Sequence, residues 1–286
     1  MTARPRRSVL YMPGSNARAL EKARTLPADA IILDLEDAVA PDAKELARRQ
    51  VSDAVKARGF GKREVIVRIN ALSTAWGVDD LVAAAHAAPD AILVPKVSSA
   101  KDLAEVEDRL GTTKVALWAM VETPLAILNI KEIAGAGGRL ACFVMGTNDL
   151  IKEFRGLHTP DRLNLAASLG LSVAAARAFG LAVIDGVYNG INDTDGFYAV
   201  CQQGRAFGFD GKTLIHPSQI EACNKVFAPS PEDVEAARKI LAAFDKPENK
   251  GKGAISLDGR MVELLHAEIA RQTVALADAI AALQAP

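Results

Sequence analysis

The stretch Ala30-Ile31-Ile32-Leu33-Asp34-Leu35-Glu36-Asp37 (residues 30–37, AIILDLED) indicates the fold class of this chain. A short, almost continuous apolar run is typical of a strand buried on both faces of a parallel sheet. Here the run ends in carboxylates. Active sites of parallel barrels are built where the strands end, so this pattern suggests a strand that leads into a site.

The same pattern recurs along the chain, with Ala-rich amphipathic segments between the apolar runs. Eight alternations of strand and helix favour an α/β fold of the (β/α)8 TIM-barrel type. A doubly wound sheet usually has fewer strands and carries a nucleotide-binding loop. The predicted strands are residues 9–12, 30–35, 64–69, 91–95, 115–121, 141–145, 181–184 and 212–215. The clearest predicted helices between them are residues 41–58, 78–88, 100–110, 124–134 and 162–179.

Composition excludes several classes of protein. The chain has 286 residues, of which 50% are hydrophobic and 24% charged, and this balance is that of a globular protein. A net charge of −1 gives no overall attraction for nucleic acid or anionic lipid, so we expect neither as a partner. The three cysteines show no CxxC spacing, and neither a secretory signal nor an 18-residue apolar run is present. We expect a cytoplasmic protein without disulfides.

The chain changes character after the eighth predicted strand. We expect residues 1–228 to form the barrel and residues 229–286 to form a C-terminal helical extension. In the extension, a helix over 230–244 precedes a polar stretch at 246–253, and a last helix is predicted from about 261 to 283. A hinge followed by a helix outside the eightfold alternation is typical of a lid or a subunit arm.

Polar side chains stand where the apolar runs end. Helix caps favour Ser, Asn and Asp, so the Arg, Lys and Glu among them are not explained as caps. Several carboxylates in one pocket need a cation, and a ligand set made only of oxygen suggests Mg²⁺. These residues are Tyr11, Asp34, Glu36, Asp37, Arg68, Asn70, Lys96, Glu122, Asn148, Asp149, Asp185 and His216.

Several of these endings lie in motifs that resemble the citrate lyase β-subunit-like group of the HpcH/HpaI aldolase superfamily. The motifs are RSVLYMPG at 7–14, ILDLEDAV at 32–39, VRIN at 67–70, VET at 121–123 and IHP at 215–217. That group includes malyl-CoA and citramalyl-CoA lyases, malyl-CoA thioesterases and the β subunit of citrate lyase. The resemblance runs through the whole chain and implies a TIM barrel, usually assembled as trimers or hexamers, that binds Mg²⁺ and acts beside a thioester.

The resemblance also assigns roles to residues. It implies that Glu122 and Asp149 bind the metal, with Mn²⁺ as an alternative to Mg²⁺, and that Arg68 holds the substrate carbonyl oxygen. Glu36 and Asp37 match acidic residues that reach the metal through water. The residues that match the CoA-binding side are Tyr11, Arg18, Lys22, Ile215 and His216. From the residues alone, Arg18 and Lys22 also fit a solvated helix face, and His216 fits a structural histidine at a strand end.

The C-terminal stretch from Gly251 to Val262 resembles the lid of the CoA lyases. That lid places an aspartate two residues after a methionine and supplies it to a neighbouring subunit as acid or base. This sequence has Glu263 there. Without the resemblance, Glu263 would be an ordinary exposed helix glutamate.

The expected function is a Mg²⁺-dependent C–C lyase or hydrolase. Its substrate would be a β-hydroxyacyl-CoA thioester of the malyl-CoA, β-methylmalyl-CoA or citramalyl-CoA type, and the reaction would pass through a thioester enolate. Two alternatives stay open: a citrate lyase β subunit that acts on an acyl-carrier-protein thioester within a complex, and a non-catalytic accessory barrel. We expect a homotrimer or a hexamer in which the lid reaches a neighbouring subunit.

Overall fold

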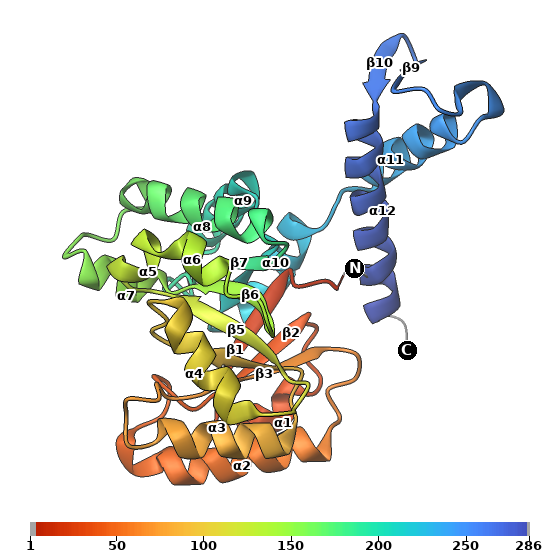
Figure 1. Cartoon of the computed structure of the whole chain (residues 1–286). Helices are drawn as coiled ribbons and strands as arrows, with labels where there is room; N and C mark the ends of the chain where they lie inside the picture. The colour runs from red at the N-terminus through yellow and green to blue at the C-terminus, as the bar shows by residue number, and fades with distance from the viewer. Residues whose placement is uncertain (1–3, 285–286) are drawn as a thin grey trace. The chain divides into compact units, whose positions relative to one another are not determined.

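A computed structural model describes residues 4–284 and confirms the TIM barrel (Figure 1). Eight parallel strands close on themselves in chain order, and β8 pairs with β1 to complete the ring. The strands are β1 Ser8–Pro13, β2 Ala30–Asp34, β3 Glu64–Arg68, β4 Ala91–Val94, β5 Ala116–Val121, β6 Leu140–Met145, β7 Ala182–Asp185 and β8 Gly211–Leu214. Each falls on one of the eight predicted apolar runs.

Both faces of the barrel strands are buried, which explains their near-continuous apolar sequences. Alternate residues point inward and form the barrel interior, among them Ile32, Ile66 and Trp118. Their neighbours point outward and pack against the surrounding helices, as Ile31 and Val67 do. Because side chains alternate across a strand, one apolar run supplies both layers of the core.

Helices connect consecutive strands and lie outside the ring (Figure 1). The expected helix over 124–134 is divided at Asn129, which ends one short helix and begins the next. The α-helices of the barrel are α1 Ala17–Ala23, α2 Lys44–Ala57, α3 Gly77–Ala87, α4 Ala100–Leu110, α5 Pro124–Leu128, α6 Ile130–Ala134, α7 Thr147–Glu153, α8 Ala166–Ala178, α9 Thr194–Phe207 and α10 Ile220–Phe227. The 3-10 helices are η1 Pro41–Ala43, η2 Leu163–Leu165 and η3 Pro217–Gln219.

The chain separates into two compact units. One is Arg6–Phe227, which is the barrel, and the other contains residues 228–284 together with Arg4 and Pro5. The second unit contains α11 Pro231–Phe244, η4 Pro247–Asn249, β9 Ala254–Leu257, β10 Arg260–Glu263 and α12 Leu264–Gln284. It has a small apolar cluster of its own, which includes Ala243, Ile255 and Val262.

The last helix begins three residues later than predicted. Met261 and Val262 belong to β10, which pairs antiparallel with β9. Asp258 and Gly259 connect the two strands and both have positive φ, 52° and 75°. Two such residues make the tight turn that suits a hairpin, so the chain returns on itself before α12 starts at Leu264.

None of the helices in residues 4–284 is both long and apolar enough to cross a membrane.

Candidate active site

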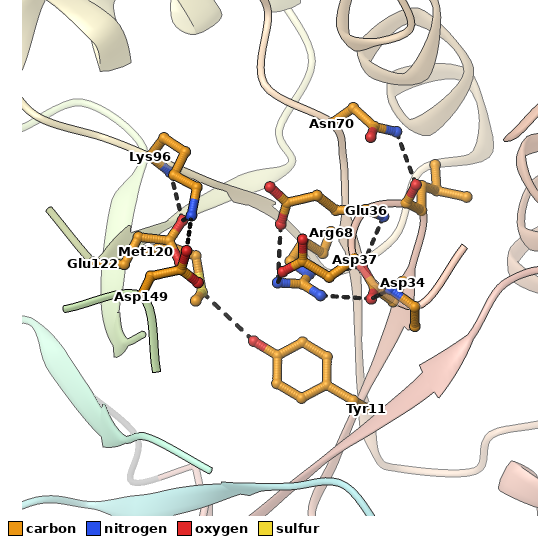
Figure 2. A network of polar contacts seen from close by, with 12 residues as sticks. Tyr11, Asp34, Glu36, Asp37, Arg68, Asn70, Lys96, Met120, Glu122 and Asp149 are labelled. Atoms are coloured by element: carbon orange, nitrogen blue, oxygen red, sulfur yellow. Dashed lines mark hydrogen bonds and ion pairs between the residues drawn. The ribbon is translucent and has the colours of Figure 1, made fainter. Parts of the chain in front are cut away.

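A cavity of about 300 Å³ opens where the barrel strands end. Parallel strands bring their C-terminal ends to one rim, so residues far apart in sequence meet there. The lining comes from the ends of several strands and the loops that follow them, and includes Tyr11, Asp34, Asp37, Arg68, Met120, Asn148, Asp149, Asn189 and Ile215. Figure 2 shows two groups of charged side chains at this rim, with Tyr11 between them.

The first group is built around Arg68, the last residue of β3. Its guanidinium donates two hydrogen bonds to the carboxylate of Asp34, from Nε to Oδ1 and from Nη2 to Oδ2, each 2.6 Å long. Its remaining terminal nitrogen, Nη1, contacts Glu36 Oε2 at 2.9 Å and Asp37 Oδ2 at 3.2 Å. A bidentate pair of this kind fixes the plane of the guanidinium as well as its position.

Tyr11 packs its ring against the same guanidinium. The Arg68 Cζ atom lies 4.8 Å from the ring centroid, which is cation–π distance. The Tyr11 hydroxyl points away from Arg68 to the sulfur of Met120, 3.5 Å away (Figure 2). Burial raises the pKa of the Tyr11 hydroxyl, so it remains a neutral phenol at physiological pH. Tyr11 therefore supports one face of Arg68 within the cavity wall.

A buried lysine fixes the loop that carries Glu36 and Asp37. Lys44 is only 6% exposed, and its ammonium donates to the carbonyl oxygens of Leu35 and Glu36 and to Asn70 Oδ1. Burial lowers the pKa of Lys44, against the pull of the carboxylates around it. The Lys44 side chain thus ties the loop after β2 to the loop after β3, behind the cavity.

The second group contains the two carboxylates predicted to hold the metal. Glu122 follows β5 and is fully buried, while the side chain of Asp149, in the first turn of α7, is 24% exposed. Glu122 Oε1 accepts a 2.8 Å hydrogen bond from the backbone N–H of Lys96. The Lys96 ammonium lies 2.6 Å from Asp149 Oδ1 and 3.5 Å from Glu122 Oε1.

Burial raises the pKa of one carboxyl in each of the two groups of charged side chains. It raises the pKa of Glu122, and the nearby Lys96 charge opposes this only in part. It also raises the pKa of Glu36 to about 8, because burial outweighs the attraction of Arg68, and Asp37 adds repulsion. Carboxyl groups that hold protons this strongly are typical of sites that bind a cation or transfer a proton.

The residues present fit a small divalent cation. Glu122 Oε2 is buried and has no hydrogen-bond partner, and such an orphan atom would be satisfied by a bound ion. No group of three or more His, Cys, Asp or Glu side chains is arranged to hold a metal in the part of the chain that the structure describes. Two carboxylates are nevertheless what Mg²⁺ typically takes, with water and substrate completing its octahedron.

The residues expected on the CoA side are not all in the cavity. Ile215 lines it and is 37% exposed. Arg18 and Lys22 share an exposed face of α1. His216 is exposed and caps η3, where its Nδ1 accepts from the backbone N–H of Ser218. This cap is compatible with the structural role that the sequence left open for His216, beside the CoA-side role that the resemblance implies.

Glu263 belongs to the C-terminal unit. It is the last residue of β10, and its backbone N–H donates to His266 Nδ1 at 3.0 Å.

Three charged residues of the site, Asp34, Lys44 and Lys96, received no specific role from sequence reasoning. Asp34 and Lys96 had a signal, because each is a charged residue at the end of an apolar run. Lys44 had none, since it lies three residues after Pro41 in a predicted amphipathic helix and looks like a surface lysine.

The fold and this site define a class of protein: TIM-barrel enzymes with a carboxylate pair and a fixed arginine at the strand ends. The chain belongs to the HpcH/HpaI aldolase/citrate lyase family, which it matches over residues 7–217. Residues 172–281 also match the C–C bond lyase family of the TIM-barrel fold.

Individual relatives agree with this assignment. The chain is 54% identical to a (3S)-malyl-CoA thioesterase of Cereibacter sphaeroides, over 99% of this chain and 98% of that protein. It is 35% identical to the citrate lyase subunit beta of Escherichia coli K12, over 91% of this chain and 89% of that subunit. A crystal structure of CitE from Mycobacterium tuberculosis in complex with magnesium, acetoacetate and coenzyme A superposes with a TM-score of 0.77. That likeness has 31% identity and covers 97% of this chain and 100% of that one.

Proposed function

We propose that this chain is a Mg²⁺-dependent enzyme that acts on a β-hydroxyacyl-CoA thioester of the malyl-CoA type, and that it hydrolyses the thioester. The observation that carries the proposal is the position of Glu122 and Asp149. Both carboxylates contact Lys96 at the cavity rim that also holds Arg68, and the Oε2 atom of Glu122 is buried without a hydrogen-bond partner. The 54% identity to a (3S)-malyl-CoA thioesterase supports hydrolysis, and the magnesium and coenzyme A in the CitE structure support the cofactor and the carrier.

In this proposal Glu122 and Asp149 hold the metal, and Glu36 and Asp37 reach it through water. A bound Mg²⁺ would act as a Lewis acid and as a template for the substrate oxygens, and Mn²⁺ could replace it. Tyr11, Arg18, Lys22, Ile215 and His216 form the CoA side.

Arg68 places a fixed positive charge where the thioester carbonyl oxygen gains negative charge. Because Asp34 holds the guanidinium by two bonds, the charge is in position before the reaction starts. Preorganised donors of this kind are worth about 3–4 kcal/mol each in other enzymes.

The hydrolysis breaks the thioester C–S bond and one O–H bond of water, and it forms a C–O bond and an S–H bond. The oxygen of a water molecule bonds to the thioester carbonyl carbon, the C–S bond breaks, and the CoA sulfur leaves as the thiol with a proton. We assign Glu263 the role of taking the proton from the water or delivering it to the leaving group. Residues 229–286 would then work as the lid that carries Glu263 to the site of a neighbouring subunit, in a homotrimer or a hexamer.

A C–C lyase is the second candidate, favoured by the 35% identity to citrate lyase subunit beta. In that reaction a base removes the proton of the β-hydroxyl, the adjacent C–C bond breaks, and the thioester enolate takes up a proton. The same arginine, carboxylates and Glu263 would serve it. The carrier could then be an acyl carrier protein instead of CoA.

The experiment is to incubate the purified full-length chain and Mg²⁺ with (S)-malyl-CoA, (R)-malyl-CoA, β-methylmalyl-CoA and citramalyl-CoA. Free CoA together with the free hydroxy acid is the expected result. Glyoxylate or pyruvate together with an acyl-CoA would identify the lyase instead. If none of the four esters is consumed even at high enzyme concentration, the proposed function is wrong.

Variants test the proposed metal ligands in the same assay. Glu122→Gln and Asp149→Asn should each abolish the Mg²⁺-dependent activity while the circular dichroism spectrum stays unchanged. The control is Asp108→Asn, at an exposed position of α4, which should keep full activity. Full activity in either metal-site variant would refute the assignment of that residue.

We further propose that the protein works in the cytoplasm. The three cysteines, Cys142, Cys201 and Cys223, are all free and buried, which suits a reducing compartment. Fractionation of the source cells tests this location.

A further inference from the structure

Lys96 has an unusual backbone conformation. It follows β4 and has a φ of 54°, in the left-handed region that residues other than glycine rarely adopt. This conformation directs its backbone N–H to Glu122 Oε1, 2.8 Å away. One oxygen of Glu122 is thereby fixed, and the other, Oε2, is left buried without a partner. Local strain of this kind persists where the surrounding structure over-determines it, often at functional sites.

The side chain of Lys96 returns to the same pair of carboxylates. Its ammonium is 2.6 Å from Asp149 Oδ1 and 3.5 Å from Glu122 Oε1, so one positive charge lies between two negative ones (Figure 2). Glu122 is fully buried and cannot be screened by water, whereas the Lys96 side chain is 39% exposed. The ammonium therefore has an open path to solvent, and the carboxylate does not.

We propose that Lys96 is a tethered counter-ion, which holds Glu122 and Asp149 together in the metal-free chain and competes with the divalent cation for them. The inference rests on the metal site of the proposed function and adds a residue to it. Lys96 acts on the metal through the two carboxylates and is a positioning residue.

The distances explain why the two cations exclude each other. A magnesium ion binds carboxylate oxygens at about 2.0–2.1 Å. Lys96 already occupies Asp149 Oδ1 at 2.6 Å, so an ion bound at that oxygen would lie within a few ångströms of the ammonium. Two positive charges at such a separation repel strongly where water is scarce. Binding of the ion must therefore expel the ammonium, and the cost of that step lowers the apparent metal affinity.

The test is calorimetric titration of Mg²⁺ into the full-length chain, without substrate. Lys96→Met removes the charge and keeps the length of the side chain. Lys96→Gly removes the whole side chain, keeps the N–H that holds Glu122, and suits the positive φ. Both variants should bind Mg²⁺ on the order of tenfold more tightly than the wild type, the factor that corresponds to about 1.4 kcal/mol of lost competition. Lys101→Met, at an exposed position of α4, is the matched control and should bind as the wild type does.

A second readout does not depend on activity either. In EDTA, Lys96→Met should melt at a lower temperature than the wild type, because two carboxylates then face each other without a counter-ion. Saturating Mg²⁺ should raise its melting temperature by more than it raises that of the wild type, because tighter binding stabilises the folded state further.

The outcomes separate the two proposals. If the wild type binds Mg²⁺ and both variants bind it equally or more weakly, the counter-ion role of Lys96 is refuted and the metal site stands. If neither the wild type nor any variant binds Mg²⁺ or Mn²⁺, the metal site itself is refuted, and the role of Lys96 with it.

Discussion

At the scale of single residues, burial and charge oppose each other most clearly at Glu36. Its side chain is only 12% exposed, and although Arg68 Nη1 lies 2.9 Å from it, burial still raises its pKa to about 8. The folded chain therefore holds a proton on Glu36 that the unfolded chain, with a carboxyl pKa near 4.5, releases. A folded-state pKa above the unfolded value makes stability fall as the pH rises between the two values.

Glu36→Gln removes this proton equilibrium. In metal-free buffer, the wild type should lose stability relative to the variant as the pH rises from about 5 to about 8, by up to about 1.4 kcal/mol per pH unit. Urea unfolding at a series of pH values measures the difference. Glu105→Gln, on the exposed face of α4, is the control and should follow the wild type. Parallel stability curves for wild type and Glu36→Gln would show that Glu36 is ionised throughout this range.

The sequence singled out most of the charged residues that lie at the barrel rim, but not their partners. Arg68, Glu122 and Asp149 could be picked out because charged groups stood where apolar runs ended. That Arg68 pairs with Asp34, and that Lys96 lies between the other two, depends on distances of 2.6 Å across the barrel rim. No sequence spacing encodes such distances, because the residues come from different strands.

At the scale of elements, the junction of β6 and α7 places one carboxylate of the pair and makes room for the other. Gly146 lies between the last residue of β6 and the start of α7, and Asp149 lies in the first turn of that helix. A side chain at Gly146 would collide with Glu122, since an added Cβ would lie 2.5 Å from Oε2 and closer still to Glu122 Cβ. The close approach of these two elements therefore requires glycine at this position.

Gly146→Ala should disturb the carboxylate pair. We expect a loss of about 1–3 kcal/mol in the free energy of unfolding, as overpacking commonly causes, and Mg²⁺ binding weakened by at least about tenfold. Denaturant unfolding and calorimetry measure the two effects. Gly170→Ala is the matched control: that glycine lies in α8, and an added Cβ would meet nothing within 4 Å. An unchanged metal affinity in Gly146→Ala would mean that Glu122 is not a ligand.

The strands were predicted more accurately than the C-terminal helix, for a physical reason. A strand buried on both faces has an apolar run that stands out from its surroundings. Met261 and Val262 carry no such signal, because the two strands of their hairpin are mostly exposed, with one buried residue in each. The apolar residues of the hairpin merge with those of α12, so the sequence reads as one longer helix.

At the scale of the whole molecule, each of the two units has its own apolar core. A chain that ends after Phe227 keeps all eight barrel strands and the whole carboxylate pair. It should fold cooperatively and bind Mg²⁺ with an affinity close to that of the full chain. Its turnover of malyl-CoA should fall by about 10²–10⁴-fold, the typical contribution of a general acid or base.

Thermal unfolding, calorimetry and the malyl-CoA assay together test this prediction. Glu263→Ala in the full-length chain is the companion variant and should lose a similar share of the turnover. Undiminished turnover in the shortened chain would show that residues 228–286 contribute nothing to the chemistry. A shortened chain that loses turnover while Glu263→Ala retains it would indicate that the extension acts through some other residue.

The sequence by itself determined the barrel and the order of its strands, and the resemblance of its motifs to a known family implied the kind of chemistry at the rim. The strands could be predicted because a strand that is buried on both faces requires an apolar run, and the residue that ends each run is visible in the sequence. Only the tertiary structure decided which of those end residues meet. Closure of the ring brings the ends of separate strands within hydrogen-bonding distance. The roles of Asp34, Lys44 and Lys96 follow from that closeness, which separations of 26 to 53 residues along the chain do not reveal.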